Sequence, residues 1–222
     1  MSGYSFSLAG VPLVALGSGA LLWPDAGLLC VSDLHLGKSG RTARYGDAPL
    51  PPFETRDTLM RLEADIEATG ARRVVCLGVS FDDSDAAHLL PEVEKLWIAR
   101  LQAGRSWIWI EGNNDPGPVS MGGSHLAELP QPPLAFRHIA QPSASGEVSG
   151  HYHPKAHLSL GGRTVARPCF LVDSDRVILP AYGTAAGGLD CRDPALRILM
   201  RREALAILTG TTPQAIAMPA PD

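Results

Sequence analysis

The chain has 222 residues, 45% of them hydrophobic and 19% charged, and a formal net charge of −4. This composition is ordinary for a soluble globular protein and excludes a disordered or low-complexity chain. The negative balance also excludes a global positive field that would draw the protein to nucleic acid or to acidic lipid.

Three apolar runs between residues 11 and 32 predict three strands, the first two joined by a Gly-Ser-Gly turn at residues 17–19. The third run ends at Asp33, so we expect this carboxylate at the C-terminal end of a buried strand, where functional residues of layered α/β folds lie. Residues 34–52 are rich in Gly, Arg and Pro and predict a loop. The apolar N-terminus has no basic residue before Lys38 and is interrupted by glycines, so we expect neither a signal peptide nor a membrane span.

Amphipathic spacing predicts a helix over residues 53–68 and another over residues 86–101. The apolar face of the first helix consists of Leu59, Leu62 and Ile66. The buried face of the second is expected to consist of Leu89, Val93, Leu96 and Trp97.

Apolar runs at residues 74–77 and 107–110 predict two further buried strands. Strands and helices then alternate, which implies a parallel central sheet with its functional residues along one edge. Trp107 and Trp109 lie within the second run, and we interpret them as core residues and not as stacking platforms.

After residue 133 the pattern changes to short strands and turns, which predicts a second, largely antiparallel sheet. Turns are expected at residues 161–162 and 173–175. We expect a single domain over residues 1–210 and a flexible tail over residues 211–222.

The four cysteines are widely spaced and form no Cys-x-x-Cys pair; they are Cys30, Cys76, Cys169 and Cys191. The first two lie in strand-like apolar runs, where a free thiol behaves as a small buried hydrophobic group. We expect all four to be reduced, which fits a cytoplasmic protein.

Five short segments carry side chains typical of a site for divalent cations that act on phosphate esters. They are Asp33-Leu34-His35, Gly78-Val79, Gly112-Asn113-Asn114-Asp115, His138 and Gly150-His151-Tyr152-His153. Asp33 and His35 alternate along an extended segment, so they face the same way and can share one ion. Each segment alone is a weak signal, but their order at strand ends is specific.

The order of these segments resembles that of the binuclear metallophosphoesterases. The flanking sequences are similar to those of the ligase-associated DNA damage response endonucleases, over about residues 10–191. The similar flanks are residues 34–39, 49–52, 55–58, 150–156, 167–170, 179–183 and 187–189.

The resemblance implies an α/β fold, a four-layer α-β-β-α sandwich with two packed mixed sheets. It implies hydrolysis of phosphodiester bonds with two metal ions, usually manganese, in a protein linked to DNA repair. The implied partners are nucleic acid or another phosphodiester substrate and the DNA ligases or helicases of repair.

The resemblance also implies the site residues. One ion would be surrounded by Asp33, His35 and His153. The other would be surrounded by Asn113, His138 and His151, although a structural role explains His138 equally well. Candidate contacts to substrate phosphates, with solvated surface side chains as the alternative, are Lys38, Lys155 and Arg167. No role is assigned to His125 or His157.

Two residues depart from the family pattern. Val79 stands where the family has the aspartate that bridges the ions, and Asn114 where it has the histidine that protonates the leaving oxygen. Two divalent ions about 4 Å apart repel by on the order of 15–20 kcal/mol at an effective dielectric constant near 20, so they need negative charge between them. We therefore expect one well-held ion and a weak or empty second site. Loss of the general acid is expected to lower the rate by about 10²- to 10⁴-fold.

A further difference is Asp82, where the family has a second histidine. Asp83 and Asp85 follow it. We interpret these three carboxylates as loop and helix-cap residues, with replacement of the lost bridge as the alternative.

Three interpretations of function remain. The first is a metal-dependent phosphoesterase of the endonuclease type with reduced activity. The second is a catalytically silent protein that binds metal, phosphate or a repair partner as a scaffold. The third is an active enzyme inactivated artificially at Val79 and Asn114. An iron oxygenase using the first three ligands has no matching fold.

Overall fold

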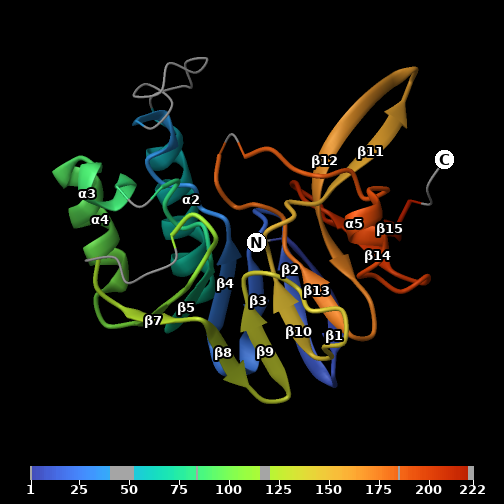
Figure 1. Ribbon diagram of the computed structural model, residues 1–222, viewed down its shortest axis with the longest axis horizontal. Helices are drawn as coiled ribbons and strands as arrows, with labels where there is room; N and C mark the ends of the chain where they lie inside the picture. Colours follow the sequence, from blue (N-terminus) through green and yellow to red (C-terminus); the bar gives the residue numbers. More distant parts are fainter. Residues whose placement is uncertain (1, 41–52, 84, 116–120, 185, 220–222) are drawn as a thin grey trace.

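The computed structural model describes residues 2–40, 53–83, 85–115, 121–184 and 186–219. Their strands form two mixed sheets that pack face to face, with helices against the outer face of each (Figure 1). This is the predicted α-β-β-α arrangement. The Pro-rich flank at residues 49–52 lies outside the described residues.

The strands of the first sheet follow one another in chain order. They are β1 (Gly3–Leu8), β2 (Val11–Leu16), β3 (Leu21–Trp23), β4 (Leu28–Ser32), β5 (Arg73–Leu77), β6 (Ser106–Ile110) and β7 (Ser124–Leu126). The strands from β1 to β4 pair antiparallel and those from β4 to β7 pair parallel. The parallel half confirms the predicted strand–helix alternation. Because the C-terminal ends of β4, β5 and β6 meet at one edge, the segments that begin with Asp33, Gly78 and Glu111 start there.

The second sheet contains the later strands in the order β15-β14-β12-β13-β10-β9-β8, and β11 pairs with β12. Their bounds are β8 (Glu128–Gln131), β9 (Leu134–Arg137), β10 (Glu147–Ser149), β11 (Lys155–Leu160), β12 (Arg163–Val172), β13 (Arg176–Ile178), β14 (Leu205–Leu208) and β15 (Gln214–Ala217). β10 pairs parallel with β9 and β13, and the other pairs are antiparallel. The β11–β12 hairpin turns at residues 161–162, as predicted, and projects beyond the sheets (Figure 1).

The helical segments are η1 (Pro24–Ala26), α2 (Glu54–Thr69), α3 (Ala86–Leu89), α4 (Glu92–Gln102) and α5 (Pro194–Arg197). α2 confirms the first predicted helix, and Gly70 ends it in a left-handed conformation with φ of +64°. None of the helices in the described part of the chain is long and apolar enough to cross a membrane.

The second predicted helix is wrong in two respects. It is divided into α3 and α4 because Pro91 cannot continue the hydrogen-bonding pattern of the preceding turn. The expected buried face is also wrong, since Leu89, Val93 and Leu96 are 57%, 57% and 62% exposed. The buried face of α4 instead includes Ile98 and Leu101.

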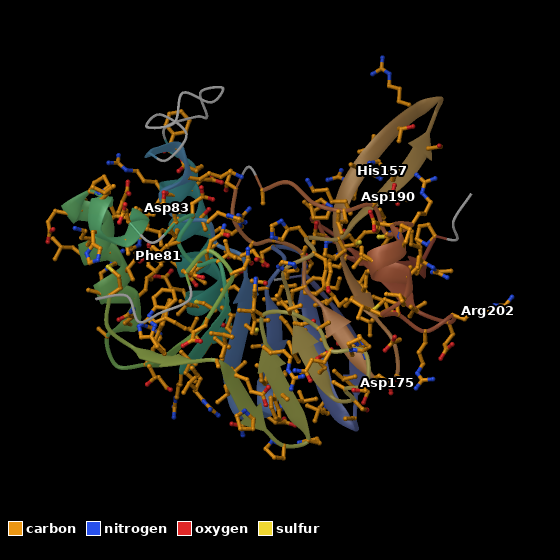
Figure 2. All side chains as sticks on the ribbon, in the orientation of Figure 1. Phe81, Asp83, His157, Asp175, Asp190 and Arg202 are labelled. Carbon is orange, nitrogen blue, oxygen red and sulfur yellow. The ribbon has the colours of Figure 1, made fainter. Side chains whose placement is uncertain are left out.

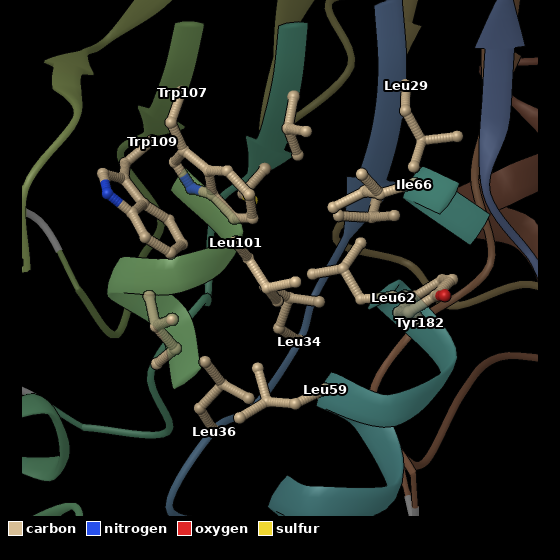
Figure 3. Packing of buried hydrophobic residues seen from close by; sticks show 14 of the residues in the cluster. Leu29, Leu34, Leu36, Leu59, Leu62, Ile66, Leu101, Trp107, Trp109 and Tyr182 are labelled. Atoms are coloured by element: carbon tan, nitrogen blue, oxygen red, sulfur yellow. The ribbon is translucent and has the colours of Figure 1, made fainter. Parts of the chain in front are cut away.

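Three apolar clusters fill the molecule. One lies between the first sheet and α2 and α4, where Leu59, Leu62 and Ile66 face Trp107 and Trp109 (Figure 3). The second fills the space between the two sheets, and the third lies between the second sheet and α5. Both tryptophans are therefore core residues, as predicted, and the fourth layer is thin because α5 is a single helical turn.

The described cysteines are all free thiols and all buried, in agreement with the prediction. Two of them are neighbours in space: the sulfur atoms of Cys169 and Cys191 lie 3.3 Å apart.

The flexible tail predicted for residues 211–222 is not what the structure contains up to residue 219. β15 pairs antiparallel with β14 over residues 214–217, and Met218 is buried in the third cluster. The error arose because this short strand has weak alternation and prolines around it, so its pairing depends on a partner elsewhere in the chain.

The burial of Met218 predicts the effect of truncating its side chain on stability. Met218→Ala is expected to lower the free energy of unfolding by about 2 kcal/mol or more, because truncating a buried Met leaves a cavity. Ile198→Ala is the control, since Ile198 is 80% exposed and its loss should change stability by less than about 0.5 kcal/mol. Urea unfolding measures both. Equal midpoints for the two variants would mean that residues 214–218 are not part of the folded structure.

Candidate metal centre

The candidate ligands come from both sheets. Asp33 and Asn113 follow β4 and β6 of the first sheet, whereas His138 follows β9 and His151 and His153 follow β10 of the second. The site therefore lies where loops of the two packed sheets meet, and it depends on how the sheets are joined.

The backbone around the site is unusually strained. Five residues here that are not glycine have positive φ: Asp33 (+54°), His35 (+49°), Val79 (+40°), His151 (+72°) and His153 (+48°). Side chains other than glycine avoid this region, and such outliers cluster where a functional geometry is imposed. Hydrogen bonds between the segments stabilise these strained conformations. One of them runs from the His35 amide to the Val79 carbonyl oxygen at 3.0 Å.

The first predicted ligand set is assembled. One ligand atom from each of Asp33, His35 and His153 lies within 4.8 Å of the others, close enough to hold one ion. Oδ1 of Asp33 lies 3.2 Å from Nε2 of His153. Oδ1 of Asp33 and Nε2 of His35 are buried without a hydrogen-bond partner among the described residues. Orphaned buried acceptors of this kind are costly unless something binds them, so the residues fit a divalent cation.

His35 is oriented by Asp82. Nδ1 of His35 lies 2.8 Å from Oδ1 of Asp82, so this nitrogen donates its proton to the carboxylate and Nε2 presents its lone pair to the cluster. A carboxylate in this position orients a ligating imidazole and raises its basicity. Asp82 is buried and committed to this contact, so its interpretation as a loop or cap residue misses its main interaction.

The second predicted ligand set is also brought together, but it contains no charged group. Nε2 of His138 lies 2.8 Å from Oδ1 of Asn113 and 3.2 Å from Nδ1 of His151. Nδ1 of His138 lies 3.0 Å from the carbonyl oxygen of Leu77, and Nε2 faces the other two residues. The set offers one amide oxygen and two imidazoles but no carboxylate.

The segment after β5 that adjoins His35 carries Val79, whose apolar side chain is 3% exposed. A β-branched residue at φ of +40° is a genuine outlier, since the left-handed region costs an L-residue about 1–2 kcal/mol. Asp and Asn tolerate this region better. The backbone at position 79 thus has the conformation that a short polar side chain prefers, although valine occupies it.

Asp115 holds this strained loop. Its Oδ2 accepts hydrogen bonds from the amides of Ser80 at 2.7 Å and Phe81 at 3.2 Å. Burial raises the pKa of Asp115, and the hydrogen bonds from the backbone of residues 79–81 oppose that shift. Both carboxylates near Val79, Asp82 and Asp115, are therefore engaged in supporting contacts.

Asn114 is exposed, and its side chain contacts Asn113 and the backbone of Asp82. Its Oδ1 accepts a hydrogen bond from Nδ2 of Asn113 at 2.8 Å, and its Nδ2 lies 3.4 Å from the carbonyl oxygen of Asp82. The side chain adjoins the second ligand set, but an amide has no proton to transfer at neutral pH.

The protonation of the site follows from burial and from the mutual contacts. Burial opposes ionisation of Asp33, but the contacts with His153 and His138 outweigh it and the pKa of Asp33 is lowered. Burial lowers the pKa of His151, and the neighbouring His138 adds to the shift. Both directions favour an ionised carboxylate and a neutral imidazole, the forms that bind a metal.

The three predicted phosphate contacts lie in different places. Lys155 lines a hollow beside His153, and Arg167 lines an adjoining hollow that shares Thr209 and Gly210 with the first. Lys38 lies in a helical turn three residues after His35. A role in phosphate binding stays a prediction for all three.

Two other histidines have structural partners. Nδ1 of His157 lies 2.5 Å from Oδ2 of Asp190, joining the β11–β12 hairpin to the segment before α5 (Figure 2). The ring of His125 stacks against Trp109. Sequence reasoning missed the contact of Asp82 with His35 and the support that Asp115 gives to residues 79–81, because no local pattern announces either.

No family model and no curated protein matches the chain. Among solved structures, the crystal structure of Pseudomonas putida nuclease MPE is similar, with a TM-score of 0.74 and 27% sequence identity. The match covers 96% of this chain and 100% of the nuclease. The resemblance inferred from the sequence is therefore confirmed, and the chain has the metallophosphoesterase fold.

Proposed function

We propose that the chain is a metal-dependent phosphodiesterase that acts on nucleic acid with reduced activity. The observation that carries the proposal is the convergence of Asp33, His35 and His153, two of whose buried acceptor atoms lack partners, in a fold shared with a nuclease. Asp33 and Asn114 are the residues closest to the proposed chemistry.

Asp33, His35 and His153 would hold the first ion. One carboxylate and two imidazoles suit Mn²⁺, Fe²⁺ or Zn²⁺, and manganese is our choice from the family resemblance. When bound there, the cation supplies Lewis-acid chemistry to a phosphate ester. The protein's contribution is to exclude water on the buried side of Asp33 and to fix the ring of His35 through Asp82.

The second ion would be held weakly or not at all. Asn113, His138 and His151 are all neutral, and Val79 supplies no negative charge to offset the repulsion between two cations. Replacement of the bridge by Asp82 is not supported, since this carboxylate is hydrogen-bonded to His35.

Catalysis would be slow for a second reason. Asn114 can donate a hydrogen bond to a phosphate oxygen, but the leaving oxygen receives no proton from it. The missing general acid alone corresponds to about 10²- to 10⁴-fold in rate.

The alternative is a catalytically silent scaffold that binds metal or phosphate. The observation that favours it is the buried valine at position 79, which offers no ligand atom. For either function we propose a cytoplasmic protein, which the free thiols support. A link to DNA repair and to its ligases or helicases rests on the family resemblance alone.

The charge at position 79 predicts the metal stoichiometry. The unaltered chain is expected to retain one equivalent of Mn²⁺ after dialysis, and Val79→Asp two equivalents. Val79→Asn is the matched control, because it relieves the backbone strain equally but adds no charge, so it should retain one. Elemental analysis checks all three. Two equivalents in the unaltered chain would refute the one-ion site.

The contact of Asp82 with His35 predicts the metal affinity. Asp82→Asn should weaken Mn²⁺ binding by about 10- to 100-fold, the usual effect of losing the carboxylate behind a ligating histidine. Asp85→Asn makes the same charge change at an exposed neighbour and should change the affinity less than about twofold. Titration calorimetry measures both. Equal affinities would show that Asp82 does not position His35.

Restoring the two missing side chains predicts a gain in activity. With added Mn²⁺, the variant Val79→Asp/Asn114→His should hydrolyse bis-p-nitrophenyl phosphate at least about 10²-fold faster than the unaltered chain. Asp33→Ala in the restored variant should remove the gain. A slow but measurable rate in the unaltered chain favours the reduced enzyme, and gain from no detectable rate favours the scaffold. Equal rates in both would contradict our account of positions 79 and 114.

A further inference from the structure

A hollow of about 400 Å³ adjoins the metal centre. His153, a ligand of the first set, forms part of its wall, so the hollow and the centre share a residue. Its wall also includes the turn between β2 and β3, residues 180–184 with Ala186 and Gly187, and Thr209 and Gly210 after β14.

The hollow is rigidly attached to the strand that carries Asp33. The amide of Tyr182 donates to the carbonyl oxygen of Ser32 at 2.7 Å, and the amide of Gly183 donates to that of Asp33 at 3.0 Å. Gly183 is required for this approach, because a Cβ there would lie 2.4 Å from the carbonyl oxygen of Leu34. The position of the hollow relative to the centre is therefore determined by the backbone.

The charge of the hollow is positive although the protein is acidic. Its lining contains Arg61 and Lys155 and no carboxylate among the described residues, in a chain of net charge −4. Nζ of Lys155 donates to the carbonyl oxygen of Ala186 at 3.1 Å, and Arg61 donates to the carbonyl oxygen of Tyr182. The carbonyl oxygens that position the two cations are uncharged. The nearest carboxylates lie behind lining residues: Asp57 accepts a hydrogen bond from Thr184 at 2.6 Å and Asp65 accepts one from Tyr182 at 2.8 Å.

We infer that this hollow binds the phosphate that follows the scissile one in a nucleic-acid strand. The inference rests on the proposed function and names its substrate class: an oligonucleotide with at least two phosphates, and not an isolated phosphodiester. Arg61 and Lys155 are the recognising groups, because a fixed guanidinium and an ammonium beside a metal centre match a second anion. A positive groove that follows the backbone is also how proteins bind single strands.

The test compares thymidine dinucleotides with phosphorothioate links, one with a 3′-phosphate and one without. Each displaces a fluorescein-labelled single-stranded 12-mer from the full chain in the presence of Mn²⁺, followed by fluorescence anisotropy. The phosphorylated dinucleotide is expected to compete about tenfold better. Lys155→Met and Arg61→Met should each reduce this ratio to about threefold or less.

Matched controls exist on α4. Lys95 donates to a backbone carbonyl oxygen as Lys155 does, and Arg100 stacks over Trp97 as Arg61 stacks over Tyr182. Lys95→Met and Arg100→Met should leave the ratio near tenfold. Arg61→Lys keeps the charge if Arg61→Met does not fold, and it should keep most of the ratio.

The outcomes separate this inference from the proposed function. Failure of the full chain to bind Mn²⁺ refutes the metal site itself. Binding of Mn²⁺ with a ratio near one, or no binding of the 12-mer, overturns only the second-phosphate site. A ratio that survives both methionine substitutions at Lys155 and Arg61 also overturns it.

Discussion

The buried carboxylate of Asp33 is the interaction on which the site depends. It follows β4 of the first sheet. Its Oδ2 accepts a hydrogen bond from the amide of His151 at 2.9 Å, and its Oδ1 lies 3.2 Å from Nε2 of His153; both histidines come from the second sheet. A buried charge is tolerated only where partners compensate it, so Asp33 requires the two sheets to pack in this register. Gly150 permits the approach, because a Cβ there would collide with the side chain of Ser32. Ligand geometry and sheet packing are thus one constraint in this protein.

Several residues around the centre adopt left-handed backbone conformations, and they show where the constraint on the site acts. Each left-handed residue has a local cost in conformational free energy. The packing of the sheets and the hydrogen bonds that Asp115 accepts from backbone amides offset that cost. Val79 is the informative case, because valine has neither a ligand atom nor a preference for this conformation. The backbone at position 79 therefore has a conformation that Asp or Asn adopts more easily than valine, and hydrogen bonds to Asp115 hold the residues that follow it.

Much of the fold and of the ligand sets is predictable from the sequence, for specific reasons. Leu59, Leu62 and Ile66 repeat at helical spacing on a helix with one buried face, so their burial follows from local pattern. The pattern failed for Leu89, Val93 and Leu96 because Pro91 interrupts the helix and changes its phase. β15 was missed because strand pairing is non-local. The contact between His35 and Asp82 joins residues 47 positions apart, and no periodicity encodes it.

The role of Asp82 changes the interpretation of the two departures from the family pattern. A carboxylate beside Val79 could in principle have replaced the lost bridge, and both nearby candidates are spent elsewhere: Asp82 on the ring of His35 and Asp115 on the loop amides. The negative charge of the site is therefore concentrated in Asp33 and, behind His35, in Asp82, whereas the second ligand set contains no carboxylate. Such a distribution strengthens one cation site and leaves the other without electrostatic support. The asymmetry is a property of the whole loop and its supports, so restoring a carboxylate at position 79 adds charge where the backbone is already shaped to present it.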